Sequence, residues 1–248
     1  MKYKALICDI DGTLVTNSQS ALPSKKVRRA VARASKKVHI GVATGRPLQM
    51  AEEIVAQLSL TGPCIFANGA VIYDPMQKKT VREHCLTTQE VMDIIPLLDE
   101  LRIKVYVRDT NGRYELTGSS KPEKPIYVYI PPIPDEALEA IEAHVRTQPN
   151  LILQKMIAWE EGKVDYMITK SEATKQHAIL EVAQILGITT HEIIGIGDGY
   201  NDFPLLMACG FKVAMGNATP DTKAIADYVA PTIDQDGVAH VIEKFILD

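Results

Sequence analysis

Two aspartates one residue apart follow an apolar run near the start of the chain. Asp9 and Asp11 come directly after residues 3–8, which have the composition of a buried strand, and Gly12 follows them. Ligands of open α/β sheets bind just past the carboxyl ends of parallel strands, and Gly12 permits a bend there. We therefore expect one carboxylate to face a substrate and the other to face its leaving group. The alternative is an ordinary surface turn, since Asp and Gly are common turn residues.

A second polar segment, Thr44-Gly45-Arg46, separates an apolar run at residues 39–43 from a helical pattern at residues 47–58. The start of a helix offers unpaired backbone N–H groups, and Thr44 adds a hydroxyl, so this segment suits an anion. The alternative role for Thr44 is that of a plain helix N-cap.

The largest group of polar side chains follows the predicted strand at residues 192–196. Asp198, Asn201 and Asp202 lie close together in the sequence, and burying them is unfavourable unless a cation or a ligand satisfies their oxygen atoms. Lys175, at the start of the preceding predicted helix, is by itself typical of a solvated lysine. A site with several carboxylates and a dianionic substrate nevertheless requires a fixed cation, and Lys175 is the candidate.

Strand and helix patterns alternate in both outer parts of the chain. This order predicts an α/β fold with a Rossmann-like, doubly wound parallel sheet formed by residues 1–80 and 168–248. Residues 81–167 have a different order of elements and predict a smaller α+β domain inserted into the first. Asn68-Gly69 lies between two short apolar runs and predicts a hairpin. Helices are expected after Pro220 and at residues 24–37, 47–58, 87–102, 135–147, 174–186, 203–208 and 237–246.

The composition restricts the class of protein. The chain has 248 residues, of which 46% are hydrophobic, and a formal net charge of −4. It therefore has no overall positive field, and we expect neither a nucleic acid nor a membrane as partner. The basic residues between Lys25 and Lys37 alternate with apolar residues at the spacing of an amphipathic helix. The four cysteines are widely spaced, so we expect reduced thiols and a cytoplasmic protein.

Four motifs occur in an order that resembles the haloacid dehalogenase superfamily. They are Asp9-x-Asp11-Gly-Thr-Leu, Thr44-Gly45-Arg46, Lys175, and Gly197-Asp198-Gly199-Tyr200-Asn201-Asp202. The insert between the second and third motifs is similar to the α/β cap of the Cof-like sugar-phosphatase branch. Asn68-Gly69-Ala70 and residues 214–218 also match that branch. One departure is Gln176 after Lys175, where the branch often has glycine; Lys170 is a nearby rival, but Lys175 precedes Ala178-Ile179-Leu180, as the family lysine usually does.

The resemblance implies a Mg²⁺-dependent phosphatase that acts on a small phosphorylated metabolite, of the sugar phosphate or phosphoglycolate class. Asp9 would attack phosphorus to form an aspartyl-phosphate, and Asp11 would protonate the leaving oxygen and later deprotonate water. The metal would be held by Asp9, the Asp11 carbonyl and Asp198, with Asp202 as a further ligand or an anchor. Substrate and phosphate binding would fall to Thr44, Gly45, Arg46, Lys175 and Asn201. We expect Arg46 and the Asn68-Gly69 turn to lie at the rim of the site and to influence substrate preference.

Two other functions remain open at this stage. A phosphomutase of the same superfamily uses the same pair of aspartates, and only the fate of the aspartyl-phosphate separates it from a phosphatase. A metal-dependent sensor without turnover is the other alternative, and it is disfavoured because every expected catalytic position is filled.

Overall fold

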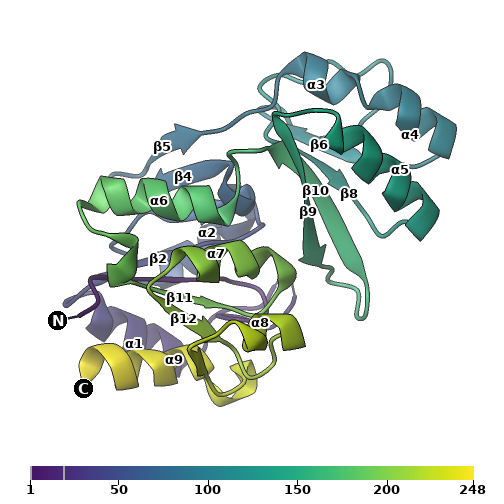
Figure 1. The fold of residues 1–248 in the computed structure, drawn as a ribbon. Coiled ribbons are helices and arrows are strands. Elements are labelled where there is room, and N and C mark those ends of the chain that lie inside the picture. The colour runs from purple at the N-terminus through teal and green to yellow at the C-terminus, as the bar shows by residue number, and fades with distance from the viewer. Residues whose placement is uncertain (1, 19) are drawn as a thin grey trace. The chain divides into compact units, whose positions relative to one another are not determined.

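The chain forms two compact units in the computed structural model, which describes residues 2–18 and 20–248. The first unit consists of residues 1–82 and 174–248, and the second unit consists of residues 83–173. Figure 1 shows the elements of each. The domain boundaries expected at residues 80/81 and 167/168 stay a prediction, although a strand of the second unit runs on to Lys170.

A five-stranded parallel sheet forms the centre of the first unit. Its order is β13-β12-β11-β1-β2, and every neighbouring pair is parallel. The strands are β1 (Ala5–Cys8), β2 (His39–Val42), β11 (Ile193–Gly197), β12 (Phe211–Ala214) and β13 (Tyr228–Val229). The residues of β1 and β11 are all buried, as expected for strands covered on both faces. The predicted α/β fold class is confirmed.

Helices cover both faces of this sheet, with α1 and α9 on one side and α6 and α7 on the other (Figure 1). The helices of the unit are α1 (Lys25–Ala34), α2 (Leu48–Gln57), α6 (Lys175–Leu186), α7 (Phe203–Ala208), α8 (Pro220–Ala224) and α9 (Gly237–Ile242). The last continues into a π-helical turn, Glu243–Leu247. The boundaries follow capping chemistry: Ser24 accepts a bond from Val27 N before α1, and Gly187 takes the left-handed conformation after α6.

The predicted hairpin about Asn68-Gly69 is confirmed. Antiparallel strands β3 (Cys64–Phe66) and β4 (Val71–Asp74) flank the turn Ala67–Gly69, in which Asn68 has a φ of 55°. A third strand, β5 (Lys79–Glu83), was not expected, because its polar sequence Lys-Thr-Val-Arg-Glu carries no apolar pattern.

The second unit is an antiparallel sheet with helices on one side (Figure 1). Its strand order is β7-β6-β8-β10-β9. The elements are α3 (Thr88–Met92), α4 (Ile95–Leu101), β6 (Tyr106–Asp109), β7 (Gly112–Glu115), β8 (Tyr127–Ile130), α5 (Asp135–Arg146), β9 (Leu151–Ile157) and β10 (Val164–Lys170). A buried apolar cluster joins them and includes Val91, Leu98, Val107, Val128 and Ile141.

The prediction of a single helix at residues 87–102 is wrong. The chain forms α3 and α4 instead, with Asp93 as the C-cap of α3 and Pro96 in the first turn of α4. Proline has no N–H to bond to the carbonyl four residues back, which is that of Met92, the last residue of α3. The break therefore has a covalent cause.

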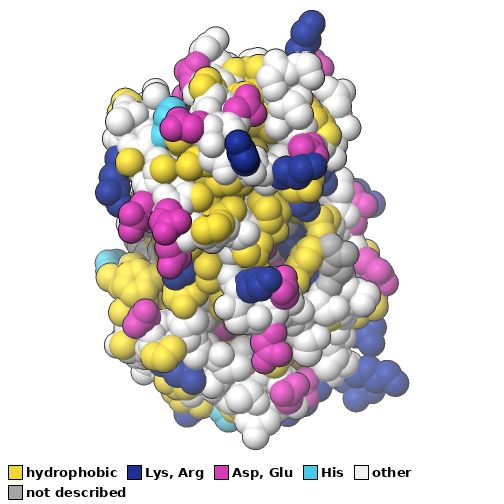
Figure 2. Space-filling model, turned by 90° about the vertical axis from the view of Figure 1, so that its right-hand side faces the viewer, with side chains coloured by type: hydrophobic (Ala, Val, Ile, Leu, Met, Phe, Trp, Pro, Cys, Tyr) yellow, Lys and Arg dark blue, Asp and Glu magenta, His cyan; other side chains and the backbone are white. Residues whose placement is uncertain are grey.

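Acidic and basic side chains are interspersed over the face of the molecule drawn in Figure 2. The basic run falls on α1 as expected: Val27, Ala30, Val31 and Ala34 are buried, while its lysines are exposed. None of the helices formed by the described residues is long and apolar enough to cross a membrane.

The second unit depends on one buried carboxylate. Asp109 is 3% exposed and accepts hydrogen bonds from Asn111 N, Glu123 N and the Tyr114 hydroxyl, at 2.7, 2.8 and 2.8 Å. Burial raises the pKa of Asp109, but these bonds outweigh it and hold the pKa below its ordinary value. The stabilisation is therefore present above the unfolded-state pKa of about 3.9 and is lost as the pH falls through the lower folded-state value.

We expect Asp109→Ala to lower the unfolding free energy of the second unit by about 3 kcal/mol, because three donors lose a charged acceptor. The only tryptophan, Trp159, belongs to this unit, so denaturant unfolding followed by its fluorescence measures the effect. Asp99→Ala, an exposed aspartate of the same unit, is the matched control and should change little. Equal unfolding midpoints for the two variants would contradict the role of Asp109.

Candidate active site

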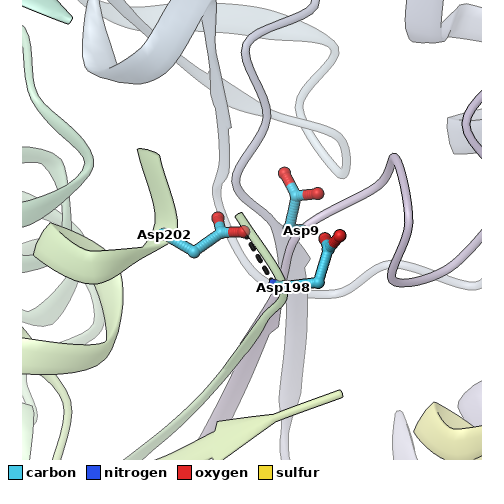
Figure 3. A group of neighbouring side chains, drawn as sticks. All are labelled: Asp9, Asp198 and Asp202. Atoms are coloured by element: carbon cyan, nitrogen blue, oxygen red, sulfur yellow. Dashed lines mark hydrogen bonds between the residues drawn. The ribbon is translucent and has the colours of Figure 1, made fainter. Parts of the chain in front are cut away.

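Three buried carboxylates converge at the carboxyl ends of two neighbouring strands. Asp9 follows β1, whereas Asp198 and Asp202 follow β11, and β1 pairs with β11 in parallel. One oxygen of each carboxylate lies within 4.8 Å of the other two. Figure 3 shows the side chains of Asp9 and Asp198 side by side, with Asp202 approaching from its own turn. The structure thus brings Asp9 together with two acids that lie about three quarters of the chain away in the sequence.

Lys175 lies between two of these carboxylates. Its Nζ donates to Asp9 Oδ1 at 2.7 Å and to Asp202 Oδ1 at 2.6 Å, and its side chain is completely buried. Lys175 is the first residue of α6, whose start is fixed by the Thr174 side chain accepting from His177 N. Burial lowers the pKa of Lys175, but the two carboxylates outweigh burial and raise it above its ordinary value. The rival Lys170 instead pairs with Glu90 at 2.6 Å within the second unit.

The Asp202 carboxylate is fully engaged by the protein. Its Oδ2 accepts from the backbone N–H groups of Asp198 and Gly199, both at 2.9 Å, and its Oδ1 accepts from Lys175. A side chain at Gly197 would place its Cβ 2.4 Å from the Cβ of Asp202, so glycine is required there. Asp202 therefore holds the turn after β11 in shape.

Asp198 has a different surrounding. Its Oδ1 accepts from the Thr13 hydroxyl at 2.9 Å. Burial, and next the negative charge of Asp202, raise the pKa of Asp198 to about 7, although the Thr13 hydrogen bond lowers it. Gly12 has a φ of +74°, and a Cβ on it would lie 2.2 Å from Asp198 Oδ2, so glycine permits the two loops to approach.

The charges of the cluster do not balance by themselves. Burial and the charge of Asp202 raise the pKa of Asp9 well above its ordinary value, even though Lys175 opposes them. Among the described residues, Lys175 is the cation that pairs with carboxylates of this cluster, and it contacts Asp9 and Asp202, so one ammonium stands against three carboxylates. A hard divalent cation fits this donor set, because it accepts carboxylate oxygens and relieves the repulsion between them. Asp9 and Asp198 are the residues best suited to hold it, since Asp202 already accepts three hydrogen bonds from the protein.

The Asp11 side chain is not part of this group of three carboxylates and binds Arg46 instead. Arg46 Nε donates to Asp11 Oδ2 at 2.8 Å, and a terminal nitrogen donates to Asp11 Oδ1 at 2.5 Å. Arg46 is 4% exposed and Asn68 is completely buried. The expectation that both lie at the rim of the site is therefore wrong: each is turned inward by a polar partner that the sequence does not reveal.

Asn68 connects the remaining expected residues. Its backbone N donates to the Thr44 carbonyl at 2.9 Å, and its side-chain oxygen accepts from Asn201 Nδ2, also at 2.9 Å. Thr44 is not the N-cap of α2, a position that Pro47 occupies; its hydroxyl accepts instead from the backbone N of Arg46 at 3.1 Å. Gly45 lies between them, in the loop after β2. Thr44 and Asn201 thus belong to one bonded network.

Sequence reasoning did not predict the contacts of three residues of the site. Thr13 binds Asp198, Asn68 joins Thr44 to Asn201, and Asn217 braces the first loop by donating to the Gly12 carbonyl at 2.7 Å. Thr13 and Asn217 lie within segments quoted for the family resemblance, and Asn68 was expected only in a turn at the rim of the site. The available signal was a polar residue beside an obligatory glycine, which by itself does not distinguish a turn from a site.

Similar proteins match almost the whole length of the chain. A profile of the haloacid dehalogenase-like hydrolases matches residues 6–132 and 133–242. A phosphoglycolate phosphatase of Methanopyrus kandleri is 31% identical over 242 residues, which cover 97% of this chain and 96% of that protein. The 5-amino-6-(5-phospho-D-ribitylamino)uracil phosphatase of Bacillus subtilis is 26% identical over 251 residues, with coverage of 98% and 96%.

Solved structures agree in fold. A haloacid dehalogenase-like hydrolase from B. subtilis superposes with a TM-score of 0.83 at 24% identity, covering 98% of this chain and 99% of that one. A sugar phosphatase of haloacid dehalogenase subclass IIB superposes with a TM-score of 0.78 at 23% identity, covering 98% of each chain. The expected resemblance to the Cof-like branch is confirmed, and the chain belongs to the haloacid dehalogenase-like hydrolase family.

Proposed function

We propose that this chain is a Mg²⁺-dependent phosphatase that hydrolyses a small phosphomonoester through an aspartyl-phosphate on Asp9. Two relatives that match almost its full length are phosphatases by name, which supports the reaction class. The observation that carries the proposal is the convergence of Asp9, Asp198 and Lys175 in one buried site. There, a carboxylate and a dianionic phosphoryl group are able to approach each other because positive charge offsets their repulsion.

Each residue has a role suited to its surroundings. Asp9 attacks phosphorus, and Lys175 holds the attacking carboxylate in place while it binds a phosphoryl oxygen. A bound Mg²⁺ would neutralise charge on the transferring phosphoryl group. Asp9 and Asp198 would hold this ion together with the Asp11 carbonyl, and Asp202 acts as the anchor of the turn rather than as a ligand. Thr44, the Gly45 amide and Asn201 bind the remaining phosphoryl oxygens.

Asp11 moves the proton. It gives a proton to the leaving oxygen as the P–O bond breaks, and the resulting carboxylate later takes a proton from the water that attacks the aspartyl-phosphate. The aspartyl-phosphate hydrolyses to free phosphate and restores Asp9.

The substrate class follows from the relatives. Phosphoglycolate and a phosphorylated ribityl compound, named for the two relatives above, are both small polar phosphomonoesters. We propose a substrate of this kind, with sugar phosphates included. We also propose that residues 83–173 form the cap domain and the rest forms the catalytic core. Each of the four cysteines is a free thiol, which supports a cytoplasmic location.

Asp9→Asn should lower phosphate release by about three orders of magnitude or more, because the amide cannot form the aspartyl-phosphate. The amide oxygen still accepts from Lys175, so the fold should persist. Phosphate release from a panel of sugar phosphates and phosphoglycolate, with Mg²⁺, is the measurement, and Asp99→Asn is the exposed control. Undiminished turnover by Asp9→Asn would exclude Asp9 as the nucleophile.

The same assay separates the alternative functions. Phosphate released from a sugar phosphate without a bisphosphate activator excludes an obligate mutase. If the unmodified protein with Mg²⁺ released phosphate from neither the panel nor an aryl phosphate, the proposed function would be wrong and a sensor would be favoured.

A second prediction compares the two candidate lysines. Lys175→Ala leaves Asp9 and Asp202 buried without their cation, so we expect at least a hundredfold loss of kcat and a lower midpoint of unfolding, by analogy with about 3 to 5 kcal/mol for broken buried pairs. Lys170→Ala breaks a partly exposed pair with Glu90 and should change kcat by less than about threefold. A larger loss of kcat in Lys170→Ala than in Lys175→Ala would identify Lys170 as the lysine of the third motif.

A third prediction concerns pH and the metal. In the metal-free protein the Asp198 carboxyl has a pKa of about 7, so it is protonated below that pH and must lose its proton to bind a cation. Mg²⁺ should therefore bind more weakly and release more protons at about pH 6 than at about pH 8, in calorimetry with buffers of different ionisation enthalpy. Asp198→Asn should reduce this proton release, and pH-independent binding would contradict the raised pKa.

Chelation should abolish turnover, and Mg²⁺ should restore it.

A further inference from the structure

Arg46 and Asp11 form a two-point ion pair. The Nε and one terminal nitrogen of the guanidinium each donate to a different oxygen of the carboxylate, at 2.8 and 2.5 Å. The Arg46 side chain is 3% exposed and the Asp11 side chain 21% exposed, so the carboxylate retains an open side while the arginine is enclosed. Such a fork fixes the plane of a carboxylate, which one hydrogen bond does not do.

The guanidinium is itself held by the protein. It donates to the Ser18 carbonyl at 2.9 Å and to the Met50 carbonyl at 3.3 Å. The backbone N of Arg46 donates to the Thr44 hydroxyl at 3.1 Å, which fixes the position from which the side chain starts. These bonds use four of the five N–H groups of the guanidinium, and both N–H groups that face Asp11 are taken. Binding a phosphoryl group through Nε or the same terminal nitrogen would require Arg46 to give up a bond to Asp11 or to Ser18.

The backbone beside Asp11 is restrained in the same way. Gly12 N donates to the Val15 carbonyl at 2.8 Å, and the Gly12 carbonyl accepts from Asn217 at 2.7 Å. Main chain and side chain are thus fixed independently, the first by Asn217 and the second by Arg46.

We propose that Arg46 is a positioning residue that aims the Asp11 carboxylate at the leaving-group oxygen, rather than a ligand of the phosphoryl group. The inference rests on the proposed function, in which Asp11 donates the proton. Each carboxylate oxygen has two lone-pair sites, and the fork occupies one on each, so the outer sites are left for the substrate oxygen and for water. When the proton passes from Asp11 to the leaving oxygen, the new carboxylate is stabilised by hydrogen bonds already in place.

The two roles of Arg46 predict different dependence on the leaving group. An alkyl phosphate expels a basic alkoxide and needs the proton, whereas 2,4-dinitrophenyl phosphate expels a stable anion and does not. A phosphoryl ligand contributes equally to both, because the phosphoryl group is the same. The ratio kcat/KM isolates the step that expels the leaving group and is unaffected by the later hydrolysis of the aspartyl-phosphate.

The experiment measures kcat/KM of the Mg²⁺-loaded full chain for glycerol phosphate and for 2,4-dinitrophenyl phosphate. We expect Arg46→Gln to lose about a hundredfold with the alkyl ester and less than about fivefold with the aryl ester. With the aryl ester, kcat should fall and a burst of dinitrophenolate equal to the enzyme should appear, because water is no longer activated. Asp11→Asn should give the same pattern, and the double variant should be no worse than Asp11→Asn alone.

Arg33→Gln, an exposed arginine of α1, is the control and should leave both values unchanged. Arg46→Lys keeps the charge without the fork and decides the question if Arg46→Gln does not fold; it should show the same selectivity for the aryl ester. Equal losses with both esters in a folded variant, or losses that multiply with Asp11→Asn, would overturn the inference and return Arg46 to phosphate binding. A failure of the unmodified protein to hydrolyse either ester would instead overturn the proposed function.

Discussion

The buried ammonium of Lys175 is the interaction on which the rest of the site depends. It joins Asp9 and Asp202, which lie 166 and 27 positions away in the sequence. A buried ammonium is unfavourable unless it is paired, and removing one partner leaves an uncompensated charge. The start of α6, the end of β1 and the turn after β11 must therefore meet for any of the three to be stable. The second unit ends before Lys175, and its insertion does not separate these three segments, because Gly69 lies against the Thr174 backbone.

The parallel sheet supplies the geometry for that meeting. β1 has β11 on one side and β2 on the other, so the motifs that follow these strands emerge at the same edge. Gly12 and Gly197 permit close approach within this edge: Gly12 faces Asp198 of the neighbouring loop and Gly197 faces Asp202 of its own turn, each across a gap too small for a Cβ. The acids are then both buried and close to one another, and burial, followed by the charge of Asp202, raises the pKa values of Asp9 and Asp198.

Sequence periodicity predicted the elements that bury an apolar face. It failed for elements and side-chain positions that depend on polar partners or on a single residue such as proline. The runs before Asp9 and Asp198 are fully buried strands, so the fold and the edge that holds the site were predictable. The polar strand β5, the two-residue strand β13 and the break before Pro96 have no periodic signal. The inward positions of Arg46 and Asn68 were missed for another reason: a polar residue shows its partner only in three dimensions, and local spacing gave Arg46 no link to Asp11.

The proposed roles of Asp9 and Asp11 differ because the chain has left strand β1 before it reaches either aspartate. In a regular strand, residues two apart point to the same face, and both carboxylates would then enter one cluster. Here β1 ends at Cys8 and the chain turns at Gly12, so Asp9 faces Lys175 while Asp11 faces Arg46. Each carboxylate thus has its own cation, one within the buried cluster and one in a separate pair. The proposed nucleophile and the proposed proton donor, two positions apart, require such a separation, since two carboxylates sharing one cation would compete for it and for the same proton.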